Sequence, residues 1–585
     1  MTSLSKTIYQ FGPFRIDTER YILFRGDELV PLSPKVFETL LFLVQNRGRV
    51  GRKEEIINAI WPDTFVAESN LAQNVFLLRK ALGEGKGEHR YIVTIPGRGY
   101  RFVAPVEEFG ATNSDQSSQS DRVGSIAVLP FTDLLGAEKD SFLGPGLADA
   151  LIMRLSSLQH LTVRPTTAVL KYADLKQDLL LIGRELGVDA LLDGTFQREG
   201  ERIRVSVQLV GLRDRRTLWA ARFDEKFTGI FTIQDTIAEQ VISSLAVKLS
   251  SDEERQLRKQ HTTSPEAFQL CIKGRYFWNQ RTTEGLRKGL IYAQQAIEID
   301  PAYALAYVGL ADSYSLLGAQ HGVLKPQDAF PKAHAAARKA LELDDRLAEA
   351  YASLGFVDCC YSWDWLSAEK NYLRAIELKP NYSTAHHWFG EMLTIRGRHD
   401  EAYLQLRTAQ EMDPLSLAIN VDLAASFYFA RQYEKSEAQL CDLLELNPNF
   451  MRAHLVLGRV YAQEGKYQKA IESLERAVNL SGNDPLNLCA LAHVFAVAGK
   501  SPEAYRILVE LHQTAQQRYI PPSQIAAVYA GLGEHELAFT LLNQALELRD
   551  IEVIWLKVNP LFDPLRSDSR FTDLIEGVNS WNRKM

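Results

Sequence analysis

The stretch SNLAQNVFLLRKALGEGKGEHRYIVTIPGRGYRF, residues 69–102, decides the fold of the N-terminal part of this chain. Its first half repeats apolar residues at the three- and four-residue spacing of one helix face. Its second half has alternating residues on both sides of PGRG, which is typical of a β-hairpin with a tight tip. The segment therefore predicts an amphipathic helix, a short turn and a hairpin with a basic tip.

The predicted helix has two different faces when its residues are projected at 100° per residue. Its core stripe is expected to be Leu71, Val75, Leu78 and Leu82. The opposite face is predicted to carry Asn70, Gln73, Asn74, Leu77 and Lys80. Amide side chains can pair with adenine in the major groove, and a leucine such as Leu77 can contact a thymine methyl group. Arg79 lies on the flank, where it suits a phosphate.

The hairpin that follows is bracketed by Arg90, Arg98 and Arg101. Gly97 and Gly99 permit the positive φ angles of a tight tip, so Arg98 between them is predicted to point outward. A basic side chain there can enter the minor groove or neutralise a phosphate. Helix and hairpin together predict binding of double-stranded DNA, and the alternative is an ordinary surface helix and hairpin.

The residues before this segment complete an order of elements. Residues 9–32 alternate in short runs and predict a small antiparallel sheet. Ser33 and Pro34 are typical of a helix start, and a second helix over about 52–61 stops at Pro62. Residues 62–68 then form a loop that leads to the third helix.

This order resembles the OmpR/PhoB-type winged helix-turn-helix domain over residues 8–105, on SPKVFETLLFLVQNRGRVGRKEEIINAIWPD, NLAQNVFLLRKALG and TIPGRGYRF. The resemblance implies that the residues facing DNA are Ser69, Asn70, Gln73, Asn74 and Arg79, with Thr94, Arg98 and Tyr100 in the wing. It also implies that loop 62–68 contacts RNA polymerase. We predict this DNA-binding domain over residues 1–106.

Charge and composition limit the class of protein. The 585-residue chain has a net charge of −7, whereas residues 1–106 carry +4 and the remainder −11. Such a weakly basic module favours binding through local geometry and pairing of subunits, as in a homodimer. No signal peptide and no apolar stretch of roughly 20 residues occurs, so we expect a cytoplasmic protein without a membrane segment.

The cysteines form no CxxC pair and are odd in number: Cys271, Cys359, Cys360, Cys441 and Cys489. We interpret them as buried thiols in a reducing cytoplasm. A redox sensor at the adjacent Cys359 and Cys360 is the alternative.

Residues 107–124 are polar and without periodicity, which predicts a flexible linker. Residues 125–250 then alternate strand and helix patterns and end in a meander, which predicts a small α/β domain. Its motifs SIAVLPF, FLGPGLADALIMRLS and ELGVDALLDGTFQREGERIRVSVQLV resemble the TolB N-terminal-like domain of bacterial signalling proteins. Asp133, Asp140 and Asp149 are interpreted as caps and turns, so we predict no enzyme, cofactor or metal site.

The C-terminal half repeats. Pro380, Pro414 and Pro448 are spaced by 34 residues, the tetratricopeptide period, with a longer unit near YSWDW at 361–365. The resemblance predicts about eight motifs over residues 264–550 and a cap over 551–585. The groove of such repeats implies a protein or peptide partner. The adjacent His386 and His387 diverge on a helix and are not expected to share a metal, and the aromatic residues of YSWDW are expected to pack rather than bind.

The predicted fold is therefore multidomain: an α+β winged helix-turn-helix, a small α/β domain and an all-α tetratricopeptide-repeat solenoid. This arrangement resembles the CadC-, ToxR- and HilA-like bacterial regulators. It predicts a sequence-specific, one-component transcriptional regulator that is soluble and senses a signal, oligomerises or binds a partner through its C-terminal regions. The alternatives are an adaptor whose winged helix docks protein rather than DNA, and an enzyme hidden in the α/β domain.

Overall fold

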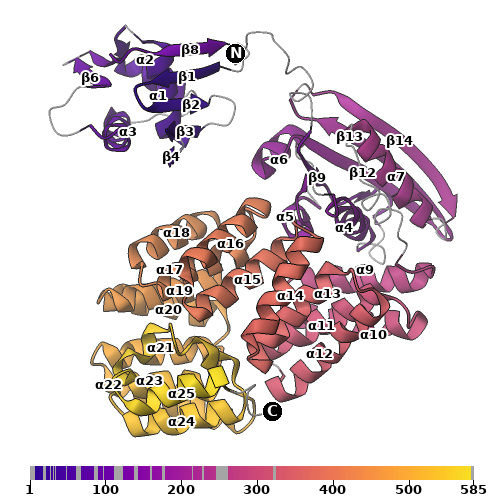
Figure 1. Ribbon diagram of the computed structural model, residues 1–585, viewed down its shortest axis with the longest axis vertical. Coiled ribbons are helices and arrows are strands. Elements are labelled where there is room, and N and C mark those ends of the chain that lie inside the picture. The colour runs from indigo at the N-terminus through magenta and orange to yellow at the C-terminus, as the bar shows by residue number, and fades with distance from the viewer. Residues whose placement is uncertain are drawn as a thin grey trace. The chain divides into compact units, whose positions relative to one another are not determined.

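A computed structural model describes residues 7–17, 22–26, 28–30, 32, 34–47, 49–60, 68–84, 90–95, 98–110, 123–136, 142–158, 161–173, 178–213, 215–226, 230–245, 261–319 and 324–580. The chain divides into two compact units, Met1–Asp121 and Arg122–Met585. Figure 1 labels the helices and strands of both units. The helices and sheets of the two units confirm the predicted fold class, a winged helix-turn-helix followed by an α/β domain and helical repeats.

The first unit opens on an antiparallel sheet. Its strands are β1 (Thr7–Phe11), β2 (Phe14–Asp17), β3 (Ile22–Arg25), β4 (Glu28–Val30) and β8 (Glu107–Gly110), in the order β4-β3-β2-β1-β8. The prediction that the linker begins at residue 107 was wrong, because β8 pairs with β1 from Gln10↔Glu107 to Thr7↔Gly110. Residues 111–122 of that linker lie outside the described residues.

Three helices and a small second sheet complete this unit. The helices are α1 (Pro34–Gln45), α2 (Lys53–Ile60) and α3 (Glu68–Ala81), and the sheet joins β5 (Gly51–Arg52), β7 (Gly99–Phe102) and β6 (Ile92–Ile95). The predicted core stripe of α3 is confirmed, since Leu71, Val75, Leu78 and Leu82 are all buried. They pack with Leu40 and Ile56 in one hydrophobic core.

The second unit begins with a mixed sheet. Parallel β11 (Thr162–Val163), β9 (Ser125–Val128) and β12 (Ala190–Glu199) are followed by antiparallel β13 (Arg202–Gly211) and β14 (Thr217–Lys226), while β10 (Thr132–Asp133) also pairs with β12. The helices are α4 (Leu143–Leu155), α5 (Thr166–Val169), α6 (Leu179–Leu186) and α7 (Ile230–Ser244), with a 3-10 turn η2 (Leu170–Tyr172). Gly194 lies inside β12 against the ring of Phe131.

The repeats form eight helix pairs among the described residues 265–547. Their bounds are α9 (Pro265–Asn279), α10 (Thr283–Ile299), α11 (Ala304–Ala319), α12 (Pro326–Leu343), α13 (Ala348–Val357), α14 (Trp365–Leu378), α15 (Ser383–Arg396), α16 (His399–Met412), α17 (Leu417–Phe429), α18 (Tyr433–Leu446), α19 (Met451–Gln463), α20 (Tyr467–Leu480), α21 (Pro485–Val497), α22 (Ser501–Ala515), α23 (Pro522–Gly531) and α24 (His535–Glu547). Consecutive helices pack together from α9 to α22 and again from α23 to α24, and α23 packs on α21.

The longer repeat near YSWDW is accommodated by a π-helical turn, η4 (Asp358–Ser362), after α13. Such a turn absorbs an extra residue without breaking the helix pair. Trp363 follows in a left-handed conformation with φ 55° and is 1% exposed in the core. This confirms that the aromatic stretch packs rather than lining an open binding surface.

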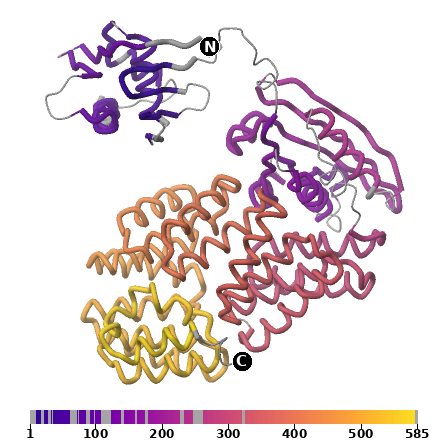
Figure 2. Tube along the Cα trace, in the orientation of Figure 1, coloured from indigo at the N-terminus to yellow at the C-terminus, as the bar shows by residue number. Residues whose placement is uncertain are grey.

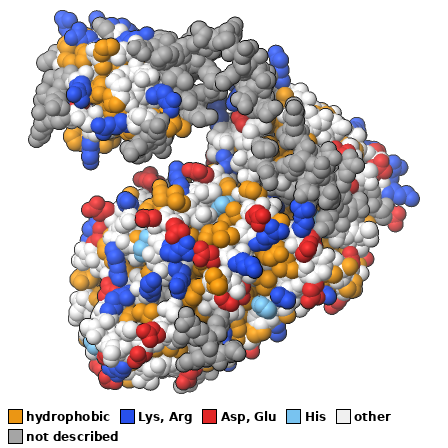
Figure 3. Space-filling view, in the orientation of Figure 1, with side chains coloured by type: hydrophobic (Ala, Val, Ile, Leu, Met, Phe, Trp, Pro, Cys, Tyr) orange, Lys and Arg blue, Asp and Glu red, His pale blue; other side chains and the backbone are white. Residues whose placement is uncertain are grey.

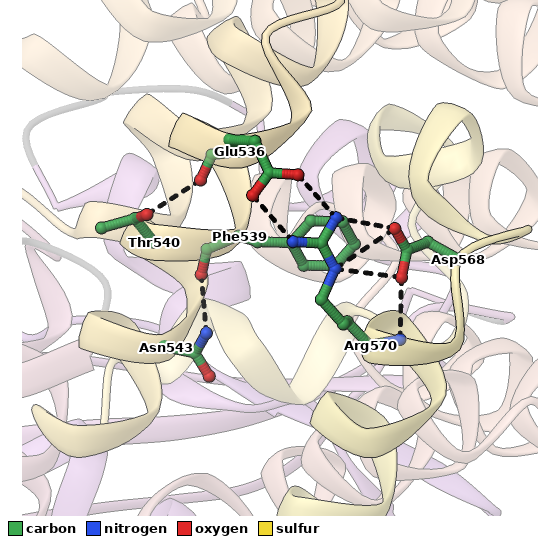
Figure 4. Close-up of polar contacts among 6 residues, drawn as sticks. All are labelled: Glu536, Phe539, Thr540, Asn543, Asp568 and Arg570. Atoms are coloured by element: carbon green, nitrogen blue, oxygen red, sulfur yellow. Dashed lines mark hydrogen bonds and ion pairs between the residues drawn. The ribbon is translucent and has the colours of Figure 1, made fainter.

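The C-terminal cap consists of η5 (Ile551–Trp555), η6 (Pro560–Leu565) and α25 (Ser569–Ser580). Figure 4 shows how Arg570 holds it to α24: the guanidinium donates to Glu536 and Asp568 and lies 4.1 Å from the centre of the Phe539 ring. Thr540 and Asn543 turn back onto the helix's own carbonyl groups. The cap thus covers the end of the last repeat.

The cap also contacts the middle repeats. Lys557 Nζ donates to the Arg396 carbonyl at 2.7 Å, and the Trp555 and Phe429 rings stack with centres 4.5 Å apart. Figure 2 shows the same return, with the yellow C-terminal helices beside the orange middle repeats. The repeats therefore curve far enough for their end to close on their middle.

The α/β domain and the repeats were predicted as separate modules in series, but they form one compact unit. Helix α4 packs on α9 so closely that a Cβ at Gly146 would lie 1.7 Å from Ile272 Cγ2. Arg275 on α9 forms an ion pair with the buried Asp149 on α4, at 2.6 Å. Arg164 donates to the carbonyls of Glu411 and Met412 at the end of α16.

Candidate nucleic-acid interface

Helix α3 presents an uncovered side opposite its core stripe. Leu77 and Phe76 are 37% and 61% exposed, and Lys80 is also exposed. Arg79 and Lys80 put two basic residues in the last turn of the helix. In Figure 3 several Lys and Arg side chains lie on the visible face of this unit. Amphipathic spacing thus buries one face of α3 and leaves the other for a partner.

Asn74 was predicted on the outer face of α3, and the structure corrects this. Its side chain is 9% exposed, and Nδ2 donates to the Lys35 carbonyl and to Thr39 Oγ1, each at 3.1 Å. Asn74 is three residues from Leu71 and four from Leu78, so it lies on the same side of the helix as both. Its amide therefore connects α3 to α1 and is not directed outward.

Arg79 joins α3 to the wing. Its Nη2 donates to the Ile92 carbonyl at 3.0 Å and to Thr94 Oγ1 at 2.9 Å, and its Nε lies 3.5 Å from Glu84. Glu84 Oε1 accepts hydrogen bonds from the backbone of Tyr91 and Ile92. Arg79 and Thr94, both predicted to contact DNA, are brought together and fix the wing against the helix.

The wing presents Arg98 but not Tyr100. Arg98 is exposed at the turn between β6 and β7, whereas Tyr100 is 7% exposed and pairs with Gly51 in β5. The prediction of Tyr100 as a DNA-facing residue conflicts with this burial. Side chains alternate along a strand, so Tyr100 shares the inward face of β7 with Phe102. Gly99 is required here, because a Cβ would lie 2.0 Å from the Gly51 carbonyl oxygen.

Three further predicted residues are only partly described. Ser69, Asn70 and Gln73 lie within α3, but their side chains fall outside the described residues, as does loop 61–67. Phe76 is a candidate that the sequence reasoning missed. The helical projection was a usable signal, because Phe76 lies about 140° from Leu71 at 100° per residue. The described outer surface of α3 thus combines apolar and basic side chains.

A second candidate site lies inside the curve of the repeats, around a cavity of about 1230 Å³. Its lining includes His387, Glu391, Asp422 and Arg452. His386 turns away to Gln405 and the Pro380 carbonyl, whereas His387 Nε2 contacts Asp422 at 2.9 Å. The two adjacent histidines therefore do diverge, as predicted.

His387, Glu391 and Asp422 place one ligand atom each within 4.8 Å of one another, a separation that a metal ion can span. Asp422 is already engaged, since its second oxygen accepts from Arg452 at 2.6 Å. Burial and then the charge of Asp422 raise the pKa of Glu391 to about 7. Asp422 therefore has a cationic partner in Arg452, whereas Glu391 has only a 3.9 Å contact with His387.

Three families of known proteins match successive parts of the chain. Residues 26–102 match "Transcriptional regulatory protein, C terminal", residues 121–240 match "HilA/YgeH-like transcriptional regulator, second domain", and residues 421–486 match "Tetratricopeptide repeat". The chain is a transcriptional regulator with an OmpR/PhoB-type DNA-binding domain. It is 25% identical to the transcriptional regulator HilA of Salmonella typhi over 423 residues, 72% of this chain and 73% of HilA.

Two more relatives cover smaller parts of the regulator. The DNA-binding domain of E. coli CadC is 25% identical, with a TM-score of 0.17, and the match covers 18% of this chain and 99% of that domain. A Rhizobium meliloti protein that carries the name of an adenylate cyclase is 30% identical over 187 residues, 32% of each chain. Among the parts of the chain that the structure describes, no helix is long and apolar enough to cross a membrane.

Proposed function

We propose that the regulator recognises a specific DNA sequence with the outer face of α3 in the major groove. The observation that carries this proposal is that α3 leaves Phe76, Leu77 and Lys80 exposed while its other face is buried. Leu77 and Phe76 suit thymine methyl groups and Lys80 suits a phosphate or guanine. Ser69, Asn70 and Gln73 would supply polar contacts from the same helix.

The wing adds contacts that do not depend on sequence. Arg98 at its exposed tip would neutralise a phosphate or enter the minor groove. Arg79 and Thr94 would act mainly by holding the wing in place, because they are bonded to each other at 2.9 Å. One winged helix offers few contacts, so we expect a homodimer on two half-sites about one helical turn apart.

The remaining parts would decide when DNA is bound. We propose a one-component, non-enzymatic regulator that acts in the cytoplasm, where its DNA lies, with loop 62–68 contacting RNA polymerase. The repeats would receive the signal by binding a protein or peptide partner. This is supported by the cavity inside their curve and by the contacts between the repeats and the α/β domain.

A protein-docking adaptor is the second candidate. It is favoured by the exposed pair Phe76 and Leu77, since apolar side chains on a helix can dock protein as well as thymine. An adaptor would show no salt-dependent binding to DNA.

Selection from a random-sequence duplex pool separates these functions. The full chain and residues 1–121, which have their own core, would be tested at two salt concentrations. We expect both to enrich one motif, with affinity falling steeply as salt rises. Stronger binding by residues 1–121 would support inhibition by the rest of the chain. No enrichment by either would favour the adaptor.

A further inference from the structure

The cavity inside the repeats is large, and the C-terminal cap bridges the repeats beside it. Its volume of about 1230 Å³ exceeds the roughly 300–1,000 Å³ of most small-molecule sites. Its lining runs from Asp149 on α4 to Trp555 on η5, so the α/β domain and most of the repeats contribute. Because Trp555 stacks on Phe429, an occupant must fit within the curve rather than extend through it as a long segment.

Most charged groups at this cavity are paired. Lys379 contacts Glu349 at 2.9 Å, and Arg452 contacts Asp422 at 2.6 Å. Such pairs satisfy each other and leave little charge for a ligand.

Two cations at the cavity have no such partner. The guanidinium of Arg281 lies 3.6 Å from the centre of the Trp278 ring, and no described residue forms a hydrogen bond or ion pair with it. Arg459 likewise has no ion pair among the described residues, and its buried Nε has no acceptor. A buried donor without an acceptor costs free energy, which a bound ligand can recover.

One acidic side chain of the same cavity, Glu391, also has no close ion pair among the described residues. Glu391 has only a 3.9 Å contact with His387, and its pKa is raised to about 7 by burial and by Asp422. The lining therefore keeps unsatisfied groups of both signs. A polyanion such as a nucleotide would meet repulsion from Glu391 and Asp422, so the chemistry favours a ligand that carries both charges.

Neutral polar groups at the cavity also include some without hydrogen-bond partners among the described residues. Asn487 and Tyr428 are 2% and 1% exposed, and Asn487 Oδ1 and Tyr428 Oη have no hydrogen-bond partner among the described residues. The indole Nε1 of Trp278 is also buried, and no residue in the described part of the chain accepts a hydrogen bond from it. Amide and hydroxyl groups of this kind suit the carbonyl and N–H groups of a peptide backbone.

We propose that the cavity binds a short peptide with free ends. Its carboxylate would pair with Arg459, its ammonium group with Glu391, and its backbone with Asn487 and Tyr428. Arg281 on Trp278 would form a shelf for an acidic or planar side chain. This inference rests on the proposal that the repeats receive the signal, and it names the chemistry of their partner.

The test uses the full chain and a pool of random hexapeptides with free ends. The same pool, N-acetylated and C-amidated, is the matched probe. Peptides that co-elute with the protein in gel filtration are identified by tandem mass spectrometry. We expect retention of the free-ended pool to exceed that of the blocked pool by about tenfold or more, because two charge pairs are lost. Equal retention of both pools, or retention of neither, would overturn the proposal.

Variants then locate the peptide. Arg459→Gln and Glu391→Gln should each lower retention by about tenfold, whereas Arg506→Gln, on an exposed residue of α22, should not. Glu391→Gln removes a buried charge and should not weaken the fold, so a loss of retention in this variant cannot be attributed to misfolding. If both variants melt normally and still retain peptide, the assignment is wrong.

A test of DNA binding by the same proteins distinguishes failure of the peptide proposal from failure of the proposed function. The same preparations would be tested on the duplex pool used above. Loss of peptide retention with normal DNA enrichment by Arg459→Gln supports the inference. Failure of the unsubstituted chain to enrich DNA would instead count against the proposed function, whatever its peptide retention.

Discussion

At the scale of single residues, buried polar groups separate structural roles from roles in binding. Asn74 donates both N–H groups of its amide within the first unit, whereas the amide oxygen of Asn487 has no partner among the residues that the structure describes. The same contrast holds for arginines, because Arg452 is paired with Asp422, whereas Arg459 has no ion pair in the described part of the chain. A polar side chain that the fold does not satisfy is the better candidate for a ligand contact.

Asn74→Ala should weaken the first unit. It removes the donor to Lys35 and Thr39 and leaves a small space beside α1, so we expect a loss of about 1–2 kcal/mol in the free energy of unfolding. Chemical denaturation of residues 1–121 measures it. The DNA motif selected by the folded variant should stay the same. A changed motif at full stability would show that Asn74 reads bases after all.

Glu391→Gln should stabilise the second unit in a pH-dependent way. Burial and Asp422 raise the pKa of Glu391 to about 7, with His387, Arg452 and Arg281 opposing them. The pKa of this carboxyl group is higher in the folded protein than in the unfolded chain. Its protonated form therefore stabilises the fold at acidic pH, and this contribution is lost as the pH rises through about 7. We expect a gain of about 1–3 kcal/mol at pH 8 that shrinks by more than half at pH 5.

Thermal melting at the two pH values measures this effect. Glu510→Gln, on an exposed glutamate of α22, is the matched control and should not change the melting temperature at either pH. A destabilised Glu391→Gln at pH 8 would mean that Glu391 is held as a favourable anion.

At the scale of elements, α3 and the wing act as one piece. Arg79 bonds to Ile92 and Thr94, and Glu84 accepts from the backbone of β6. The helix is thereby held at a defined angle to the hairpin, so its outer face and Arg98 can meet one duplex together. Pre-organisation of this kind reduces the ordering cost of binding.

Substitutions in the two parts should have different effects on DNA binding. Gln73→Ala should relax the preference at one base pair by roughly 1–3 kcal/mol, because a base contact is lost. Arg98→Ala should weaken all sequences alike and reduce the salt dependence, since it removes a phosphate contact. Quantitative binding to the selected motif and to single-base variants measures both.

Arg15→Ala is the control for these substitutions, because Arg15 is exposed on β2, outside α3 and the wing. It should leave affinity and preference unchanged. The assignment of α3 as the reading helix fails if Gln73→Ala and Arg98→Ala behave like this control.

At the scale of the whole molecule, the second unit is closed by long-range contacts. The cap joins the middle repeats through Trp555 and Lys557, and the α/β domain joins the repeats through Arg275 and Arg164. Changes inside the cavity can therefore affect α9 and α4 through packed elements, which is the contact route that coupling between sites uses.

Trp555→Ala should open the curve of the repeats. Loss of the stack on Phe429 removes partly buried aromatic surface, so we expect a loss of about 1–3 kcal/mol and a larger radius of gyration. Thermal melting and small-angle scattering measure these changes. Leu404→Ala, at a site 61% exposed on α16, should change neither quantity. An unchanged radius in Trp555→Ala would show that the cap contact does not hold the curve.

The local elements of the protein and the classes of its domains could be predicted from the sequence alone. Periodic spacing located the core stripe of α3, and the 34-residue period located the helix pairs, because both depend on contacts between residues near in sequence. The extra residue near Trp363 was also visible, as a break in that period. Composition placed the linker too early, since the short strand Glu107–Gly110 becomes stable only when β1 pairs with it.

Tertiary structure decided how these elements meet and which polar groups remain free. The sequence predicted that Asn74 and Tyr100 face DNA, but α1 covers Asn74 and β5 covers Tyr100. The union of the α/β domain with the repeats depends on Arg275, 126 residues from Asp149. The cavity with Arg459 and Glu391 exists only because the repeats curve back on themselves. Contacts over such separations are set by packing in three dimensions, for which a single sequence carries no periodic signal.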